Sequence, residues 1–288
     1  MSAVAAMPAR RATSTWAALR ATGAAGIASA VVIAVAVLIT IFGPLLATND
    51  PQLGQLALSY VGPSAGSPLG FDGQGRDVVS RLLVGARTSM LGPLAVVILC
   101  MTVGTLLAVW AAWTGGLPDT VISSGLDILF AFPGILLAIL AATVFGAGLV
   151  AATLALAVAY TPYVARVLRG AALRERSLLY VSALEVQGAS GLSICLRHLI
   201  PNMVPLIVAQ ATTLFGYAMV DLAAISFLGL GVQPPNPDWG VMVSENASGV
   251  VQGYPLAALS AGICILVVVI AFNLLGQRLQ ENAEDRPR

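Results

Sequence analysis

Long apolar runs constrain the fold of this chain more than any other feature of its sequence. Each run holds about 20 residues or more, and a helix of about 20 apolar residues crosses a hydrocarbon core of about 30 Å. A segment in lipid must satisfy its own backbone hydrogen bonds, as an α-helix does. We therefore predict an all-α integral membrane protein with six transmembrane helices. The six apolar runs cover residues 27–46, 89–113, 119–145, 148–168, 203–231 and 255–277.

The composition agrees with this class and excludes others. Charged residues make up 9% of the chain, against about 25% in a soluble domain. A net charge of +1 argues against a nucleic-acid binder that depends on a basic excess. The chain has no lysine, so it lacks a phosphate-binding P-loop, and another subunit must hydrolyse any nucleotide that drives it. Three scattered cysteines and one histidine predict neither a metal site nor a cofactor.

The arginines predict how the chain is oriented, because cytoplasmic loops carry an excess of basic residues. With the N-terminus inside, eleven of the fourteen arginines face the cytoplasm, and Arg76, Arg81 and Arg87 lie outside. We therefore predict a protein of the bacterial cytoplasmic membrane with both termini in the cytoplasm. The predicted parts are an N-terminal tail (1–26), a first transmembrane helix (27–47), an outer loop (48–88), a five-helix core (89–278) and a C-terminal tail (279–288).

Residues 169–202 interrupt the apolar runs with an arginine-rich segment. Apolar residues at helical spacing predict a helix over 174–187, and Gly188 is a candidate helix stop. Ser190 is a candidate N-cap of a second short helix, which we expect to end at Pro201. Connections between helices are usually about 2–8 residues long. The segment is therefore long enough to dock another protein, although an ordinary solvated loop is the alternative.

The stretch "YVSALEVQGASGLSICLRHLIPN" resembles the cytoplasmic coupling loop of ABC-importer permeases, whose signature contains E-A-A, a later glycine and I/L-x-P. Ala183, Gly188, Leu199, Pro201 and Asn202 match the signature. Ser182 stands where the signature has an acid, Leu184 replaces the second alanine, and Glu185 is the nearest acid. The resemblance implies that a cytoplasmic ATPase docks on Ser182, Ala183, Glu185, Gly188, Ala189, Arg197 and Pro201.

Four further stretches resemble the dipeptide/oligopeptide/nickel branch of these permeases. They are "SPLGFDGQGRDVVSRLLVGARTSM" (67–90), "LDILFAFPGILLAIL" (126–140), "ISFLGLGVQPPNPDWGVM" (225–242) and "AFNLLGQRLQENAEDRPR" (271–288). The first is similar to the family's G-T-D-x-x-G-R-D-x-x-S-R-x-x-x-G-A-R, with Phe71 in place of threonine.

The resemblance implies the transmembrane domain of a type I ABC importer, with cytoplasmic coupling helices and no catalysis of its own. The implied partners are a homologous second permease, two cytoplasmic ATPase subunits and a periplasmic or lipid-anchored solute-binding protein. The implied cargo is a di- or oligopeptide, and nickel, an opine or haem are the alternatives.

The outer stretch 67–90 also has a physical interpretation. Asp77 lies at a helix start, where the helix dipole favours an acid, and apolar residues follow it at helical spacing. We therefore predict an interfacial amphipathic helix that touches membrane lipid and places its arginines at headgroup level. The residues of this outer interfacial motif are Asp72, Arg76, Asp77, Arg81 and Arg87.

Two acids fall within predicted spans, Asp127 and Asp221. Such residues usually face a cavity or a partner, so both are candidates for the translocation pathway. Asp221 could meet the ammonium of a peptide, or it could form a hydrogen bond between helices. A proton-coupled secondary transporter that uses these acids is an alternative, but the sequence has no inverted repeat of the kind that such proteins show.

An intramembrane protease is a third possibility, since residues 188–191 read G-x-S-G and His198 follows. A serine protease of this kind needs its serine and histidine to meet in an enclosed site. Here both residues lie in one arginine-rich loop, which argues against a protease.

Overall fold

The computed structural model describes residues 23–284, and its regular secondary structure in this range is helical. The predicted N-terminal tail (1–26) lies largely outside that range, whereas residues 279–284 of the predicted C-terminal tail belong to the last helix. The long helices are α2 (Gly23–Leu46), α3 (Val78–Thr114), α6 (Leu149–Arg176), α9 (Ile200–Phe227) and α12 (Leu256–Glu284). The shorter elements are η1 (Leu56–Leu58), α4 (Gly116–Phe130), α5 (Gly134–Phe145), α7 (Leu179–Val186), α8 (Gly191–Ile194), a π-helical turn η2 (Cys195–Leu199), α10 (Trp239–Glu245) and α11 (Ala247–Val251).

Five of the described helices are long and apolar enough to cross a membrane. The third predicted span, 119–145, is instead the pair α4 and α5, which meet at an angle of 81°. Pro133 caps the start of α5, and a proline disfavours helical backbone at the residue before it. The chain therefore has six spans only if this bent pair counts as one.

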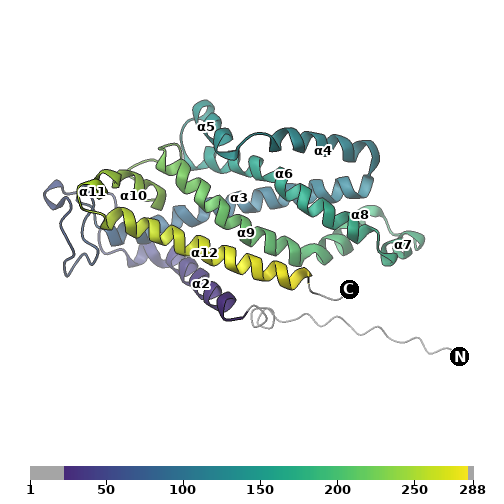
Figure 1. Cartoon of the computed structure of the whole chain (residues 1–288), viewed down its shortest axis with the longest axis horizontal. Coiled ribbons are helices and arrows are strands. Elements are labelled where there is room, and N and C mark those ends of the chain that lie inside the picture. Colours follow the sequence, from purple (N-terminus) through teal and green to yellow (C-terminus); the bar gives the residue numbers. More distant parts are fainter. Residues whose placement is uncertain (1–22, 285–288) are drawn as a thin grey trace.

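The long helices form an elongated bundle (Figure 1). Helix α3 packs along α6 and α9, α12 packs along α9, and α2 covers α3 and α12 from outside. The bent pair lies against α6. One end of the bundle holds α10 and α11, and the opposite end holds α7 and α8 (Figure 1). We refer to these as the α10 end and the α7 end.

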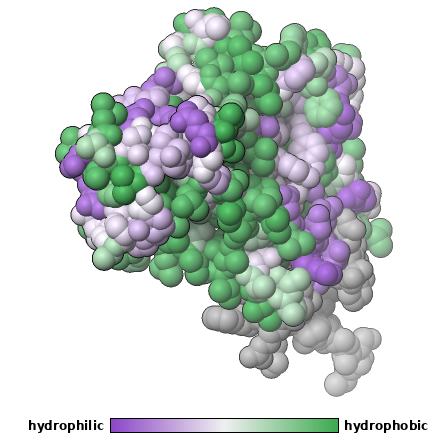
Figure 2. All heavy atoms as spheres, turned by 60° about the vertical axis from the view of Figure 1, so that its left-hand side comes forward, coloured by the Kyte–Doolittle hydropathy of each residue, from purple (hydrophilic) through white to green (hydrophobic). Residues whose placement is uncertain are grey.

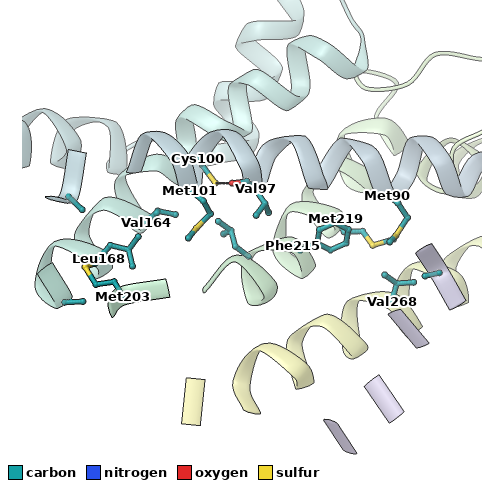
Figure 3. Close-up of a cluster of buried hydrophobic side chains, with 14 of the residues drawn as sticks. Met90, Val97, Cys100, Met101, Val164, Leu168, Met203, Phe215, Met219 and Val268 are labelled. Carbon is teal, nitrogen blue, oxygen red and sulfur yellow. Dashed lines mark hydrogen bonds between the residues drawn. The ribbon is translucent and has the colours of Figure 1, made fainter. Parts of the chain in front are cut away.

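The core between the helices combines flexible and small side chains. Met90, Met101 and Met219 are buried where α3 and α9 meet (Figure 3). Gly104 lies so close to α6 that a Cβ atom there would sit 2.6 Å from a methyl carbon of Val164. Helices in lipid associate through such close approaches between small residues, and Gly104 permits one between α3 and α6.

The outer surface of the bundle is apolar. Figure 2 shows hydrophobic residues over most of the visible side, with hydrophilic residues concentrated towards the α10 end. Soluble monomers rarely expose apolar patches larger than a few hundred Å². The surface is therefore that of a protein that spans a membrane several times.

Candidate functional site

The loop at the α7 end leaves the bundle as a direct continuation of two long helices. Helix α6 runs to Arg176, α7 follows at Leu179–Val186, and the chain returns through α8 and η2 into α9. The single helix predicted over 174–187 is therefore interrupted at Ser177 and Leu178. Both arms of the loop therefore continue into long helices of the bundle, α6 and α9.

The turn between the two arms has the predicted local geometry. Gly188 has a φ of +79°, a conformation in which glycine carries no penalty, and its N–H donates to the carbonyl of Glu185 at 2.9 Å. The Ser190 hydroxyl accepts a hydrogen bond from the N–H of Ser193 at 3.4 Å and caps α8. Both predictions, the glycine stop and the serine cap, are confirmed.

The expected helix end at Pro201 is wrong. Residues Gly191–Phe227 form one continuous helix that passes through the proline. A proline inside an α-helix lacks an N–H and clashes with the carbonyl four residues earlier. Here the preceding turn, Cys195–Leu199, is π-helical, and the N–H of Ile200 bonds to the carbonyl of Cys195. The wider turn accommodates Pro201 without a break.

Polar side chains tie the two arms of the loop together at its base. The Tyr180 hydroxyl donates to Oε1 of Glu175 at 2.9 Å, and Nδ2 of Asn202 donates to the same oxygen at 2.7 Å. Nδ2 of Asn202 also lies 3.2 Å from the Tyr180 hydroxyl. One carboxylate thus joins the end of α6, the start of α7 and the start of α9, which gives the loop a closed base.

The loop is also seated on the end of α3. Nη1 of Arg176 donates to the carbonyl of Ala112 at 2.7 Å, and its guanidinium lies 5.0 Å from the ring centroid of Trp113. On the other arm, a Cβ atom at Gly191 would sit 2.7 Å from Cε2 of Trp113. Only a glycine fits against the indole in this position, so Trp113 fixes where the loop returns.

The predicted docking residues are accessible along this loop, from its tip to its base. Ser182, Ala183, Glu185, Gly188, Arg197 and Pro201 are exposed, and Ala189 is half-buried. Val181 anchors α7 by its burial in the core. The structure therefore brings the predicted residues to one end of the molecule, where another protein can reach them.

Sequence reasoning missed three apolar side chains in the same place. Leu179 and Val186 are 88% and 90% exposed at the two ends of α7, and Leu192 on α8 is 71% exposed. Leu179 and Val186 are seven residues apart and share a face of the helix. This face differs from the one that Val181 buries. The seven-residue spacing of the two apolar residues could therefore have revealed a second apolar face from the sequence.

Ser190 and His198, which suggested a protease, have structural roles instead. The Ser190 hydroxyl caps α8, and the His198 ring packs at a tilt against that of Tyr180, with 6.4 Å between their centroids.

The two acids of the predicted pathway each bond to a residue of α6. Asp127, on α4, pairs with Arg166, whose guanidinium lies 4.5 Å from the ring centroid of Phe130. Asp221, on α9, accepts a hydrogen bond of 2.6 Å from the Tyr160 hydroxyl. The hydrogen bond between helices that was expected as an alternative for Asp221 is therefore confirmed, and Asp127 also bonds across helices. Contact with cargo remains a prediction.

The outer motif differs from the predicted interfacial helix. Val78 starts the continuous helix α3, and Asp77 caps it by accepting from the N–H of Ser80 at 2.8 Å. Arg76 and Arg81 are only 2% and 0% exposed, so neither lies at headgroup level. A buried guanidinium is tolerated when it is paired with acids, and the fold supplies these partners. Arg87 is exposed.

The acids that pair with these arginines come from two distant segments. Nη2 of Arg76 and Nη2 of Arg81 each donate to Oε2 of Glu245 at 2.7 Å. Nε of Arg76 also donates to Asp72 at 2.8 Å, and Nε of Arg81 lies 3.6 Å from the same carboxylate. We call Asp72, Arg76, Arg81 and Glu245 the outer ion cluster. It joins the outer loop, α3 and α10, and its two positive and two negative charges balance.

Comparison with known proteins agrees with this architecture. Residues 73–288 match the family described as "Binding-protein-dependent transport system inner membrane component". The glutathione transport system permease protein GsiD of Pectobacterium atrosepticum is 39% identical over 220 residues, which cover 76% of this chain and 73% of that protein. The probable D,D-dipeptide transport system permease protein DdpC of Escherichia coli is 35% identical over 255 residues, or 88% of this chain and 85% of that protein.

A third relative is the dipeptide transport system permease protein DppC of Alkalihalophilus pseudofirmus. It is 36% identical over 245 residues, which cover 85% of this chain and 80% of that protein. The family match begins after α2 and covers the helices from α3 to α12, including the loop at the α7 end and α10. The chain therefore belongs to the family of binding-protein-dependent transport system inner membrane components.

Proposed function

We propose that this chain is one transmembrane half of an ATP-driven importer of di- or oligopeptides. The observation that carries the proposal is the loop at the α7 end, which has a closed base and an exposed tip with apolar and polar docking residues. Relatives named for dipeptide and glutathione transport support peptide cargo. A second, homologous permease completes the pathway, and a periplasmic or lipid-anchored binding protein delivers the cargo at the α10 end.

In this proposal the loop at the α7 end is cytoplasmic and fits a cleft of one of two ATPase subunits. Closure of the ATPase pair displaces the loop, and α6 and α9 carry the displacement into the membrane. Helix α6 also moves the bent pair, because Arg166 and Arg169 bind Asp127 and Asp119 of α4. The orientation, with both termini in the cytoplasm, follows from the arginine distribution.

The decisive experiment is ATP-driven uptake of labelled peptides in proteoliposomes that contain both permeases, the ATPases and the binding protein. Uptake should need ATP and should continue after a protonophore removes the proton gradient. Uptake that follows the gradient without ATP would support a secondary transporter instead. Competition by nickel, an opine or haem, with none by peptides, would replace the proposed cargo.

The coupling role of the loop needs its own test, which is co-purification of the ATPase subunits. Leu179→Asp and Val186→Asp place charges on exposed apolar positions that the bundle does not use. We expect both to reduce ATPase binding without loss of folded permease. Val251→Asp on α11, a position that is 90% exposed at the opposite end of the molecule, is the matched control and should retain the ATPases. Equal binding by the loop variants and the wild type would contradict the docking role.

A further inference from the structure

Polar side chains gather where α6 meets α9, within an otherwise apolar part of the bundle. The Tyr163 hydroxyl donates to Oε1 of Gln210 at 3.3 Å, and further along the helices the Tyr160 hydroxyl donates to Asp221 at 2.6 Å. Tyr217 lies between these two pairs on α9. We call these residues the α6–α9 seam: Tyr160, Tyr163, Gln210, Tyr217 and Asp221.

The seam differs from the other polar groups on exposed parts of the long helices. The hydroxyls of Thr102 and Thr212 each donate to the carbonyl four residues earlier in their own helix, at 2.7 Å. A side chain bonded in this way needs no partner outside its helix. A tyrosine hydroxyl extends too far from its backbone to bond like this. The seam hydroxyls must therefore find partners on another helix, in water or on a ligand.

Tyr217 has no such partner among residues 23–284. Its side chain is 52% exposed, and no described group forms a hydrogen bond with its hydroxyl. A hydroxyl that faces hydrocarbon without a partner is unfavourable. Val220, next to Asp221, and Val158, two residues before Tyr160, are also exposed, so the surface is mixed rather than polar. The exposed hydroxyl indicates that this face is not covered by lipid.

Asp221 lies one helical turn beyond Tyr217. Residues four apart on a helix are neighbours on its surface, about 5–6 Å apart at Cβ, so the carboxylate and the exposed hydroxyl share one face of α9. Within the described residues, Tyr160 is the one side chain that bonds to Asp221. The carboxylate is half-buried and forms no ion pair with a described arginine. Its charge is therefore available to a cation that enters from outside the chain.

The seam also has the extent of a short peptide. Gln210 and Asp221 are eleven positions apart on α9, which corresponds to about 16 Å along the helix axis. Gln210 itself is buried, and Tyr163, which bonds to it and is 37% exposed, presents a hydroxyl at that end. An extended chain advances about 3.3 Å per residue, so a peptide of three to five residues fits between these two ends. Tyrosine hydroxyls can donate to and accept from peptide groups, and a carboxylate can bind an ammonium.

We propose that the α6–α9 seam is the wall along which cargo crosses this subunit, with Asp221 binding the free amino terminus of a peptide and Tyr217 bonding to its backbone. The proposal rests on the proposed function, a peptide importer, and adds the site and the chemical group that it recognises. The ammonium supplies the counter-charge that the described chain does not. Coverage of the same face by lipid or by the second permease would be inconsistent with it.

Thiol labelling tests whether water and cargo reach the seam. In the assembled importer, with Cys100, Cys195 and Cys264 replaced by alanine, we introduce Tyr217→Cys or, as a control, Val208→Cys. These positions are nine residues apart and leave α9 on opposite sides, and both are exposed in the isolated chain. A charged, membrane-impermeant methanethiosulfonate should label the Tyr217→Cys thiol and leave the Val208→Cys thiol unlabelled.

Cargo should then protect the labelled position in a way that depends on its amino terminus. Millimolar trialanine should slow the labelling of Tyr217→Cys, whereas N-acetyl-trialanine should not. A thiol at 217 that reacts in the isolated chain but not in the assembly would place the second permease there and overturn the proposal. Labelling that trialanine does not slow would also overturn it.

Transport by otherwise wild-type importer separates this inference from the function on which it rests. If ATP-driven trialanine uptake occurs, we expect Asp221→Asn to lower uptake per ATP hydrolysed by about tenfold or more, since a charged contact is lost. Tyr254→Phe removes a hydroxyl at the α10 end, and Thr212→Val removes one that is bonded within α9; both controls should transport normally. Normal uptake by Asp221→Asn and Tyr217→Phe would overturn the inference alone. Absence of peptide uptake by the wild type would overturn the proposed function.

Discussion

Replacing Glu245 by glutamine should destabilise the α10 end more than any comparable surface change. Glu245 accepts three hydrogen bonds from two arginines, at 3.3, 2.7 and 2.7 Å, and it is 11% exposed. Glu245→Gln keeps the shape of the side chain but leaves the outer ion cluster with one unbalanced positive charge. Arg81, which is fully buried, would then keep Asp72, 3.6 Å from its Nε, as its one acidic partner among the described residues, besides a hydrogen bond of 3.4 Å to the carbonyl of Pro51.

The magnitude follows from the burial of the cluster. Removing one partner of a buried ion pair costs about 3–5 kcal/mol, because the remaining charge is left uncompensated. An exposed pair contributes about 0–1 kcal/mol. At about 2–4 °C per kcal/mol for chains of this size, Glu245→Gln should lower the melting temperature by roughly 6–20 °C. The matched control is Glu281→Gln, whose acid is 60% exposed beside Arg278, and its melting temperature should be close to that of the wild type.

Thermal unfolding of the detergent-purified chain, followed by size-exclusion chromatography after heating, measures both changes. A double variant sharpens the test, since Arg81→Met in the Glu245→Gln background removes the unbalanced charge and leaves Arg76 paired with Asp72. Replacing buried pairs by apolar residues is often neutral, so most of the lost stability should return. A Glu245→Gln protein that melts within 2 °C of the wild type, or a double variant less stable than the single one, would refute the reasoning.

The remaining predictions concern the loop at the α7 end. A side chain at Gly188 meets no atom within 4 Å, so Gly188→Val should cost only the backbone strain of about 1–2 kcal/mol. It should uncouple cargo-stimulated ATP hydrolysis while the helices stay folded, and wild-type coupling would contradict this. Ala183→Trp should block ATPase co-purification by its bulk, whereas Glu185→Ala should have a smaller effect. A larger loss of co-purification with Glu185→Ala than with Ala183→Trp would indicate a contact dominated by charge. Gly191→Leu should displace Trp113, detectable as a red shift of tryptophan fluorescence relative to a Trp113→Phe background, and an unchanged spectrum would show that the loop is not seated there.

Features that depend on local backbone chemistry could be predicted from the sequence. The apolar runs identify the long helices because a span needs about 20 apolar residues wherever it lies. Gly188 and Ser190 were recognisable because a left-handed helix stop and an N-cap are set by a few neighbouring residues. The third span was predicted without its bend because an apolar run carries no information on the direction of the chain, and Pro133 in its middle was not given weight.

Features that depend on distant contacts could not be predicted in the same way. Arg76 and Arg81 read as surface residues because their partner Glu245 is more than 160 positions away. The α6–α9 seam was not predicted either, because its residues come from two helices that are distant in the sequence. Asp221 is the exception, since a charged residue inside an apolar run can be recognised from the sequence. Pro201 was read as a helix end because a π-helical turn has no clear sequence signature.

That π-helical turn keeps the loop in phase with the membrane helix although it holds an extra residue. A π turn holds about one residue more than an α turn, so the turn Cys195–Leu199 takes up that residue without the rotation of about 100° that one residue adds in a regular helix. If the same residues formed a regular α-helix, α8 and the loop tip would be turned by about that angle relative to α9. The docking face would then point away from where it now lies, with every span intact. In the proposed importer, the π turn therefore fixes the direction from which the ATPase approaches the bundle.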